Sequence, residues 1–246
     1  MKRRTFLKTA ATFSAVSVLT PSFTLANEEK NPFGITKKPR KFEVKNSYNF
    51  EQSKEITQLW VPLPKDEDYQ KVVSFKYDGN FSEAKIVKNP YNTRVLYVKW
   101  NDANIKPILD VNFGVVMQER TTDFSKATSN TNYPSEVLEF LEGTKHIPIT
   151  KGLTAYVNDI TKDSKTPLQK AQAIYDWTVS TMYRDESVIG CGIGDAQKSI
   201  EEKIYGGKCT DISSVFVCLL RNAKIPARET FGIRVGQSKI SNACGK

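Results

Sequence analysis

Histidine is the scarcest reactive residue in this sequence of 246 residues, with His146 as its single example. One imidazole excludes a classical zinc site that takes two or more histidines from the same chain. Four cysteines are too few for a disulfide scaffold at this length. No window approaches the roughly 18 to 20 consecutive apolar residues that span a bilayer. Phosphate loops, dinucleotide fingerprints and EF-hand loops are also missing, so we expect no cofactor and no metal.

The net charge of +9 does not indicate nucleic-acid binding once the basic residues are located. Four of them lie in the first 26 residues, which contain no acidic residue. The one dense basic run is Lys37 to Lys41, and its only aromatic neighbours are Phe33 and Phe42. A basic run with so few aromatic residues is more typical of a solvated linker than of a nucleic-acid or anionic surface. We therefore expect no nucleic-acid partner.

Residues 1–26 have the pattern of a signal peptide. A basic start with Arg3 and Arg4 is followed by an apolar stretch from Thr9 to Leu19 and by a small-residue cleavage site after Ala26. The apolar stretch is too short for a stable span. The arginine pair resembles the twin-arginine export motif, which implies export of a folded chain. The alternative to a signal peptide is an N-terminal helix that packs on the domain. Because we favour the signal peptide, we expect a periplasmic protein.

The rest of the chain divides into a β-rich part and a helical part. Residues 27–41 have no periodicity and are predicted to be a linker. Residues 42–122 alternate short β-type runs with turn residues at spacings near ten, which predicts a β-sandwich. The expected strands are 42–44, 56–61, 72–77, 84–87, 95–100 and 108–118.

From residue 123 the apolar period changes from 2 to 3.6, which predicts helices over residues 123–246 and an α+β fold class for the whole chain. A short helix is expected over 136–142, capped by Ser135, and a second has one apolar face from Leu153 to Ile160. Thr166 and Gln169 predict a capping box that opens a helix to about Met182. The expected apolar face of this helix consists of Leu168, Ala171, Tyr175, Val179 and Met182.

Cys209 is the candidate nucleophile because of its position. It follows two glycines and precedes a helical apolar stripe that Pro226 ends, so it is predicted to lie at a helix N-terminus. The partial positive charge and free N–H groups there favour a thiolate. The glycines are expected to leave room for a substrate backbone, and the amide N–H of Cys209 to serve an oxyanion hole. The alternatives are a small buried cysteine in the turn or half of a disulfide.

The residues around Cys209 resemble the transglutaminase-like superfamily of papain-type thiol enzymes, in its bacterial exported branch. The resemblance is strong from about Ala171 to Gly236 and weak before that. The sequences that carry it are G-G-K-C-T-D at 206–211, L-R-N-A at 220–223, I-P-A-R at 225–228, F-G-I-R-V-G at 231–236, I-Y-D-W-T at 174–178, C-G-I-G-D at 191–195 and W-V-P-L-P at 60–64.

The resemblance implies a catalytic Cys-His-Asp triad in that chain order, acting on amide bonds of proteins or peptides as a protease, an amidase or a transglutaminase. Only 37 residues follow Cys209, and none is histidine. We therefore expect a β-sandwich followed by a papain-like, transglutaminase-like domain that lacks its C-terminal strands, and a chain inactive as it stands. The alternative is a non-catalytic exported binding or scaffold protein, or the product of a disrupted gene.

The remaining candidates are structural. His146 lies upstream of Cys209, against the order of the family, and is expected to be a surface or structural residue. Asp211 is expected to complement the helix dipole. With Cys209 kept as a thiol and Cys218 expected in the core, Cys191 and Cys244 form the most plausible disulfide, although four cysteines allow three full pairings. The sequence does not indicate an oligomeric state.

Overall fold

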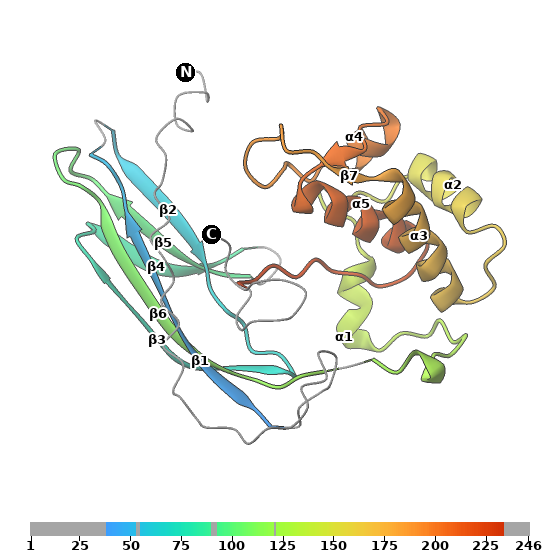
Figure 1. Ribbon diagram of the computed structural model, residues 1–246, viewed down its shortest axis with the longest axis horizontal. Coiled ribbons are helices and arrows are strands. Elements are labelled where there is room, and N and C mark those ends of the chain that lie inside the picture. Colours follow the sequence, from blue (N-terminus) through green and yellow to red (C-terminus); the bar gives the residue numbers. More distant parts are fainter. Residues whose placement is uncertain (1–37, 53–54, 90–92, 121, 234–246) are drawn as a thin grey trace, which may run out of the picture. The chain divides into compact units, whose positions relative to one another are not determined.

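The computed structural model describes residues 38–52, 55–89, 93–120 and 122–233 (Figure 1). These residues fall into two compact units: the first comprises the described residues up to Thr122 together with residues 232–233, and the second is Asp123–Phe231. The expected signal peptide and residues 27–37 of the expected linker lie outside the described residues.

Six strands form the first unit as two three-stranded antiparallel sheets. One sheet has the order β1-β6-β3 and the other has the order β2-β5-β4. Each strand overlaps one of the expected β-type runs, although β1 begins at Arg40, one residue before the expected end of the linker. The strands are β1 (Arg40–Asn49), β2 (Thr57–Pro62), β3 (Gln70–Gly79), β4 (Glu83–Lys88), β5 (Arg94–Trp100) and β6 (Ile108–Met117).

The two sheets share one apolar core, which makes the unit a β-sandwich. Leu96, Val98 and Trp100 alternate along β5 and are fully buried, as are Leu109 and Val111 on β6. Because side chains alternate between the two faces of a strand, each sheet turns one apolar face to the other. The expected α+β class with an N-terminal β-sandwich is confirmed.

The second unit is mainly helical (Figure 1). A capping box between Thr166 and Gln169 opens the longest helix, as predicted. The expected helix over 136–142 is instead a short α-helical turn that continues as a 3₁₀ turn, and Ser135 is its first residue rather than its cap. The elements are η2 (Phe124–Lys126), α1 (Ser135–Leu138), η3 (Glu139–Leu141), α2 (Lys151–Ile160), α3 (Pro167–Thr181), β7 (Tyr183–Arg184), α4 (Ala196–Glu201), β8 (Gly206–Gly207) and α5 (Cys209–Asn222).

Helix α5 lies at the centre of this unit. It contacts α2, α3 and α4, and nearly all of its residues from Ser214 onward are buried. Two further contacts fix its end: Asn222 accepts from Thr154 Oγ1 at 3.1 Å and donates to the Pro148 carbonyl at 3.0 Å. A buried helix whose polar groups are hydrogen-bonded is a rigid support, and it fixes the position of the residue at its N-terminus.

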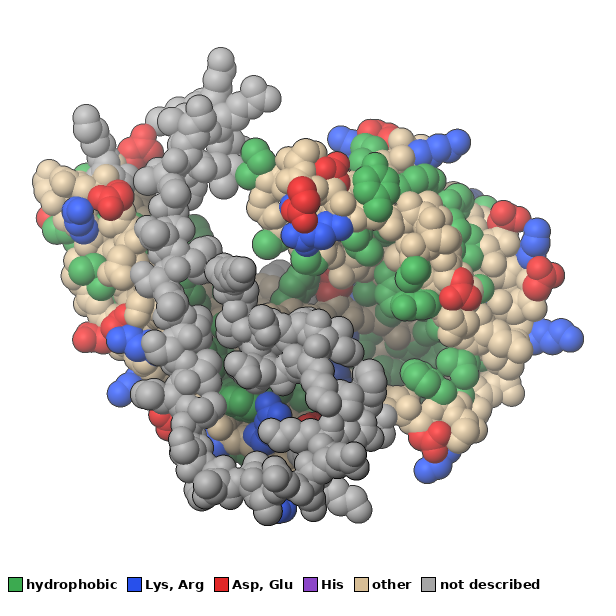
Figure 2. Space-filling view, in the orientation of Figure 1, with side chains coloured by type: hydrophobic (Ala, Val, Ile, Leu, Met, Phe, Trp, Pro, Cys, Tyr) green, Lys and Arg blue, Asp and Glu red, His purple; other side chains and the backbone are tan. Residues whose placement is uncertain are grey.

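The apolar face predicted for α3 is only partly correct. Ile174 and Thr178 are its buried residues, while Tyr175 and Val179 are 53% and 63% exposed. Figure 2 shows apolar side chains among the polar ones on the surface of the helical unit. The apolar residues of α3 lie on most sides of the helix, so the apolar pattern in the sequence does not identify the face that contacts α5.

None of the helices within the described residues has both the length and the apolar character needed to cross a membrane.

Candidate active site around Cys209

Cys209 is the first residue of α5, as the sequence predicts, and its side chain is exposed. The exposure excludes the alternative of a small buried cysteine. The amide N–H of Thr210 donates to the carbonyl of Cys191 at 3.2 Å. The amide N–H of Cys209 has no acceptor among the residues that the structure describes, so it is free to donate to a ligand.

Asp211 joins the start of α5 to the loop that precedes α4. Its Oδ1 accepts from the backbone N–H groups of Ile193 and Gly194, both at 2.9 Å. Its Oδ2 accepts from the N–H of Lys208 at 2.9 Å, which caps the helix. Asp211 therefore does more than complement the helix dipole, because it also fixes the loop beside Cys209.

The two glycines before Cys209 do not leave space for a substrate backbone, contrary to our expectation. A Cβ atom on Gly206 would lie 2.9 Å from the ring of Tyr183, and one on Gly207 would lie 2.6 Å from the Cβ of Asp211. The glycines are needed because neighbouring side chains approach this close to the backbone. Side chains of Tyr183 and Asp211 already occupy the positions that Cβ atoms would take at these glycines.

Strand β7 brings a cluster of charged side chains to Cys209. β7 pairs in parallel with β8, so that Arg184 lies opposite Gly207. Nη1 of Arg184 is 3.7 Å from Sγ of Cys209, and Nε of Arg184 is 2.6 Å from a carboxylate oxygen of Glu186. Glu186 also forms an ion pair with Lys208, whose side chain is only 8% exposed.

The hydrogen bonds from Arg184 and Lys208 lower the pKa of Glu186 to about 2. The hydrogen bond to Glu186, its negative charge and the contact with Cys209 raise the pKa of Arg184. At neutral pH Glu186 is therefore a carboxylate, and Arg184 is a cation that faces the sulfur.

The sequence alone does not identify these charged residues as neighbours of Cys209. Arg184 and Cys209 are 25 residues apart, and only the pairing of two very short strands brings them together. The one signal in the sequence is the charged run Arg184-Asp185-Glu186, which begins two residues after the predicted end of the helix at Met182.

The other cysteines are in different surroundings. Burial raises the pKa of the Cys218 thiol to about 12, which agrees with the core position predicted for it. Cys191 is exposed in the loop before α4. Cys244 lies outside the described residues, so the pairing of Cys191 with Cys244 stays a prediction.

His146 is exposed, and its backbone carbonyl accepts from the N–H of Ala196 at 3.1 Å. No hydrogen bond joins its imidazole to Cys209 in the part of the chain that the structure describes. Across the same ranges, no group of three or more histidine, cysteine, aspartate or glutamate side chains is placed to hold a metal ion.

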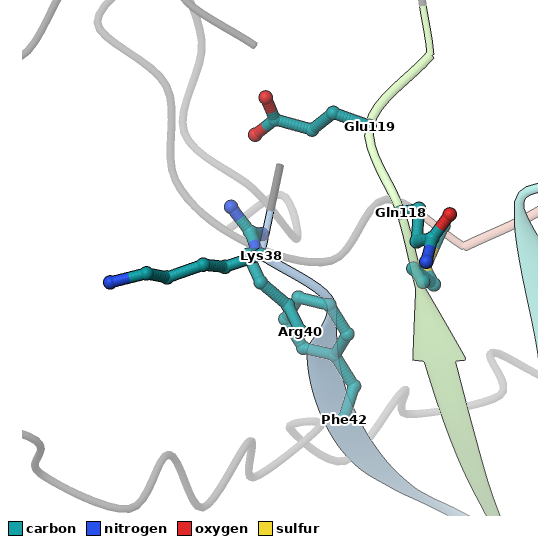
Figure 3. Close-up of a pocket in the computed structure, with 6 residues that line it drawn as sticks. Lys38, Arg40, Phe42, Gln118 and Glu119 are labelled. Carbon is teal, nitrogen blue, oxygen red and sulfur yellow. The ribbon is translucent and has the colours of Figure 1, made fainter. Parts of the chain in front are cut away.

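A pocket in the first unit is separate from these residues (Figure 3). It is lined by Lys38, Arg40 and Phe42, which lie before and at the start of β1, and by Met117, Gln118 and Glu119, which lie at and after the end of β6. It contains neither a thiol nor an imidazole, so its residues do not offer the chemistry predicted for Cys209.

Comparison with known proteins agrees with the geometry around α5. Residues 154–245 match the transglutaminase-like superfamily. An uncharacterized protein of Haemophilus influenzae is 36% identical over 235 residues, which cover 92% of this chain and 64% of that protein. The crystal structure of a putative cysteine protease from Cytophaga hutchinsonii superposes with a TM-score of 0.62 at 16% identity, over 77% of this chain and 65% of that one. This chain therefore spans less than two thirds of the length of either relative, and the structural likeness concerns the fold alone.

Proposed function

We propose that the chain, whose residues 154–245 match the transglutaminase-like superfamily, uses Cys209 as a nucleophile that acts on amide bonds of proteins or peptides. The observation that supports this best is the exposed thiol at the N-terminus of the buried helix α5. Helix N-termini favour thiolates, and a thiolate is the form of cysteine that attacks carbonyl carbon.

In this proposal the thiolate adds to the amide carbonyl and the oxygen becomes an oxyanion. The N–H of Cys209, which has no acceptor among the described residues, donates to that oxygen in this proposal, as part of an oxyanion hole. Collapse of the adduct breaks the C–N bond, the amine leaves with an added proton, and an acyl-thioester stays on the sulfur. Water then gives the acid, or a second amine gives a new amide.

Protonation of the leaving amine needs a general acid that Cys209 itself does not supply. His146 makes no hydrogen bond with Cys209 in the described structure. We therefore propose that the acid and base of the full reaction are supplied by a group other than His146 and the charged cluster around Cys209. For the same reason, a non-catalytic exported protein that binds peptides is the second candidate function.

The proposal includes a periplasmic location and the domain limits expected from the sequence: a signal peptide over 1–26, a linker over 27–41, a β-sandwich over 42–122 and the transglutaminase-like domain over 123–246. Replacing Arg3 and Arg4 by lysines retains the charge and removes the arginine pair that the twin-arginine route reads. The variant precursor is expected to stay in the cytoplasm. Unchanged export would assign it to another route.

A peptide with an electrophilic vinyl sulfone tests whether the thiol acts as a nucleophile. Such a probe is attacked by a thiolate and needs no proton for a leaving group. We expect one equivalent to be bound at Cys209, shown by peptide mapping, with no binding at this site in Cys209→Ala. Modification of Cys191 at a rate equal to or higher than that of Cys209 would favour the non-catalytic candidate.

A further inference from the structure

Backbone pairing fixes the position of Arg184 relative to the sulfur of Cys209. The N–H of Asp185 donates to the carbonyl of Gly207 at 2.9 Å, which anchors the end of β7 beside the turn that leads into α5. The backbone of Arg184 is therefore held next to Cys209. From this position its side chain reaches the sulfur, with Nη1 3.7 Å from Sγ.

Glu186 orients the guanidinium group. Nε of Arg184 is 2.6 Å from Oε1 of Glu186, and Nη2 is 3.4 Å from Oε2. These two contacts use one edge of the planar guanidinium and leave Nη1 directed at the sulfur. Glu186 is itself held by Lys208, which is nearly buried although it carries a charge.

We propose that Arg184 is the ion-pair partner of the Cys209 thiolate, and that Glu186, anchored by Lys208, is the positioning residue that directs Nη1 to the sulfur. The inference rests on the nucleophilic role proposed for Cys209. In this chain, a guanidinium occupies the position beside the thiolate where activated cysteines often have an imidazolium.

A guanidinium gives this thiol a specific chemical limit. It stabilises a neighbouring negative charge, but it does not release a proton near neutral pH. Cys209 is therefore expected to react with acyl groups whose leaving group departs as an anion. With p-nitrophenyl acetate, the thiolate bonds to the carbonyl carbon, the C–O bond breaks, and p-nitrophenolate leaves with the electron pair. An acetyl thioester forms without any proton transfer.

The test measures two rates on the purified full-length chain. One is the release of p-nitrophenolate, and the other is iodoacetamide modification of the Cys209 peptide between pH 6 and pH 10. The variants are Arg184→Gln, Arg184→Lys and Glu186→Gln, with Cys209→Ala as the background. The matched controls are Arg228→Gln, an exposed arginine over Phe140, and Glu202→Gln, which removes an exposed ion pair with Lys198.

We expect a burst of one equivalent of p-nitrophenolate that Cys209→Ala lacks. At pH 6.5, Arg184→Gln should lower both rates about tenfold, the effect of one nearby charge on an ionisation. The difference should vanish near pH 10, where ordinary thiols are ionised, and should shrink in about 1 M salt. Arg184→Lys should retain part of the rate, Glu186→Gln should be intermediate, and both controls should match the original chain.

Two results would overturn the inference. Unchanged rates in Arg184→Gln would show that no ion pair forms, and an equal loss at pH 6.5 and pH 10 would show a merely structural role. Should Arg184→Gln fail to fold, as judged by circular dichroism, the comparison of Glu186→Gln with Glu202→Gln decides the question by the same criteria. Neither rate involves an amide, so a chain that does not act on amides can still show the ion pair between Arg184 and Cys209. Failure of the amide proposal and failure of the ion-pair proposal are therefore distinguishable.

Discussion

Oδ1 of Asp211 accepts a hydrogen bond from the N–H of Gly194 at 2.9 Å, and this contact joins the first turn of α5 to a loop seventeen residues earlier in the sequence. The same oxygen accepts from Ile193, and the other carboxylate oxygen accepts from Lys208. One side chain thus fixes both the cap of the helix that carries Cys209 and the loop next to it.

Asp211→Asn is expected to destabilise the second unit by about 2 kcal/mol, because hydrogen bonds to a charged acceptor are worth roughly 1.5 to 3 kcal/mol. The new amide also turns a donor toward an N–H that needs an acceptor. Urea unfolding followed by fluorescence measures the change, with Asp176→Asn on the exposed face of α3 as the matched control. Equal midpoints for the two variants would show that the carboxylate does not hold the loop.

Gly192 supports the same interpretation of the loop. Its φ of +92° is a left-handed value, and a Cβ atom there would lie 2.0 Å from Oδ2 of Asp211. The sequence shows glycines at 190, 192 and 194 but not the carboxylate they approach. A glycine-rich loop is predictable from composition, whereas its partner depends on where the tertiary fold places it.

Asn222 is predicted to be a major source of stability at the other end of α5. It is 1% exposed, and its amide donates to the carbonyls of Pro148 and Cys218 and accepts from Thr154. Asn222→Ala leaves several buried groups without partners, which costs about 3 kcal/mol. Thermal unfolding measures this, and Asn158→Ala on the exposed face of α2 should change stability by less than about 0.5 kcal/mol. Similar losses in both variants would contradict the proposed role.

The sandwich was easier to predict than the helical site for a physical reason. Along β5, alternate residues such as Val98 and Trp100 are buried on one face, and this period of two is visible in the sequence. Along α3, by contrast, Ile174 is buried and Tyr175 next to it is exposed, although both are apolar. Which face of such a helix is buried depends on the elements that pack against it, here α2 and α5. The contact of Arg184 with Cys209 has the same origin, since it depends on a two-residue parallel pairing that no local pattern encodes.

The thiols of Cys209 and Cys218 are expected to differ in their pH dependence. Burial raises the pKa of Cys218 to about 12, so this thiol should stay unlabelled by iodoacetamide up to about pH 9.5 in the folded chain and react only after unfolding in urea. Cys209 should react under native conditions because it is exposed. Peptide mapping of both sites measures the difference. Comparable native labelling of Cys218 would disprove its burial.

The raised pKa of Cys218 also makes the free energy of unfolding of this unit depend on pH. The folded state holds the thiol proton more tightly than the unfolded chain, whose thiol titrates near pH 9. This contribution is complete below pH 9 and is lost as the pH rises toward 12. The urea midpoint of the original chain should therefore fall more steeply between pH 9 and pH 11 than that of Cys218→Ala. Parallel slopes would show that other groups dominate.

The chain by itself is expected to turn over amides negligibly, because Arg184 can stabilise a thiolate but cannot protonate a leaving amine. General acid–base assistance is typically worth ~10²- to 10⁴-fold, so its absence leaves a stoichiometric nucleophile. Casein cleavage and incorporation of a labelled amine into a glutamine-donor peptide are the assays, with Cys209→Ala as the blank. Added imidazole should produce a Cys209-dependent rate, since it supplies the missing proton donor. His146→Ala should behave like the original chain. Turnover without imidazole that disappears in His146→Ala would identify His146 as the base and refute this prediction.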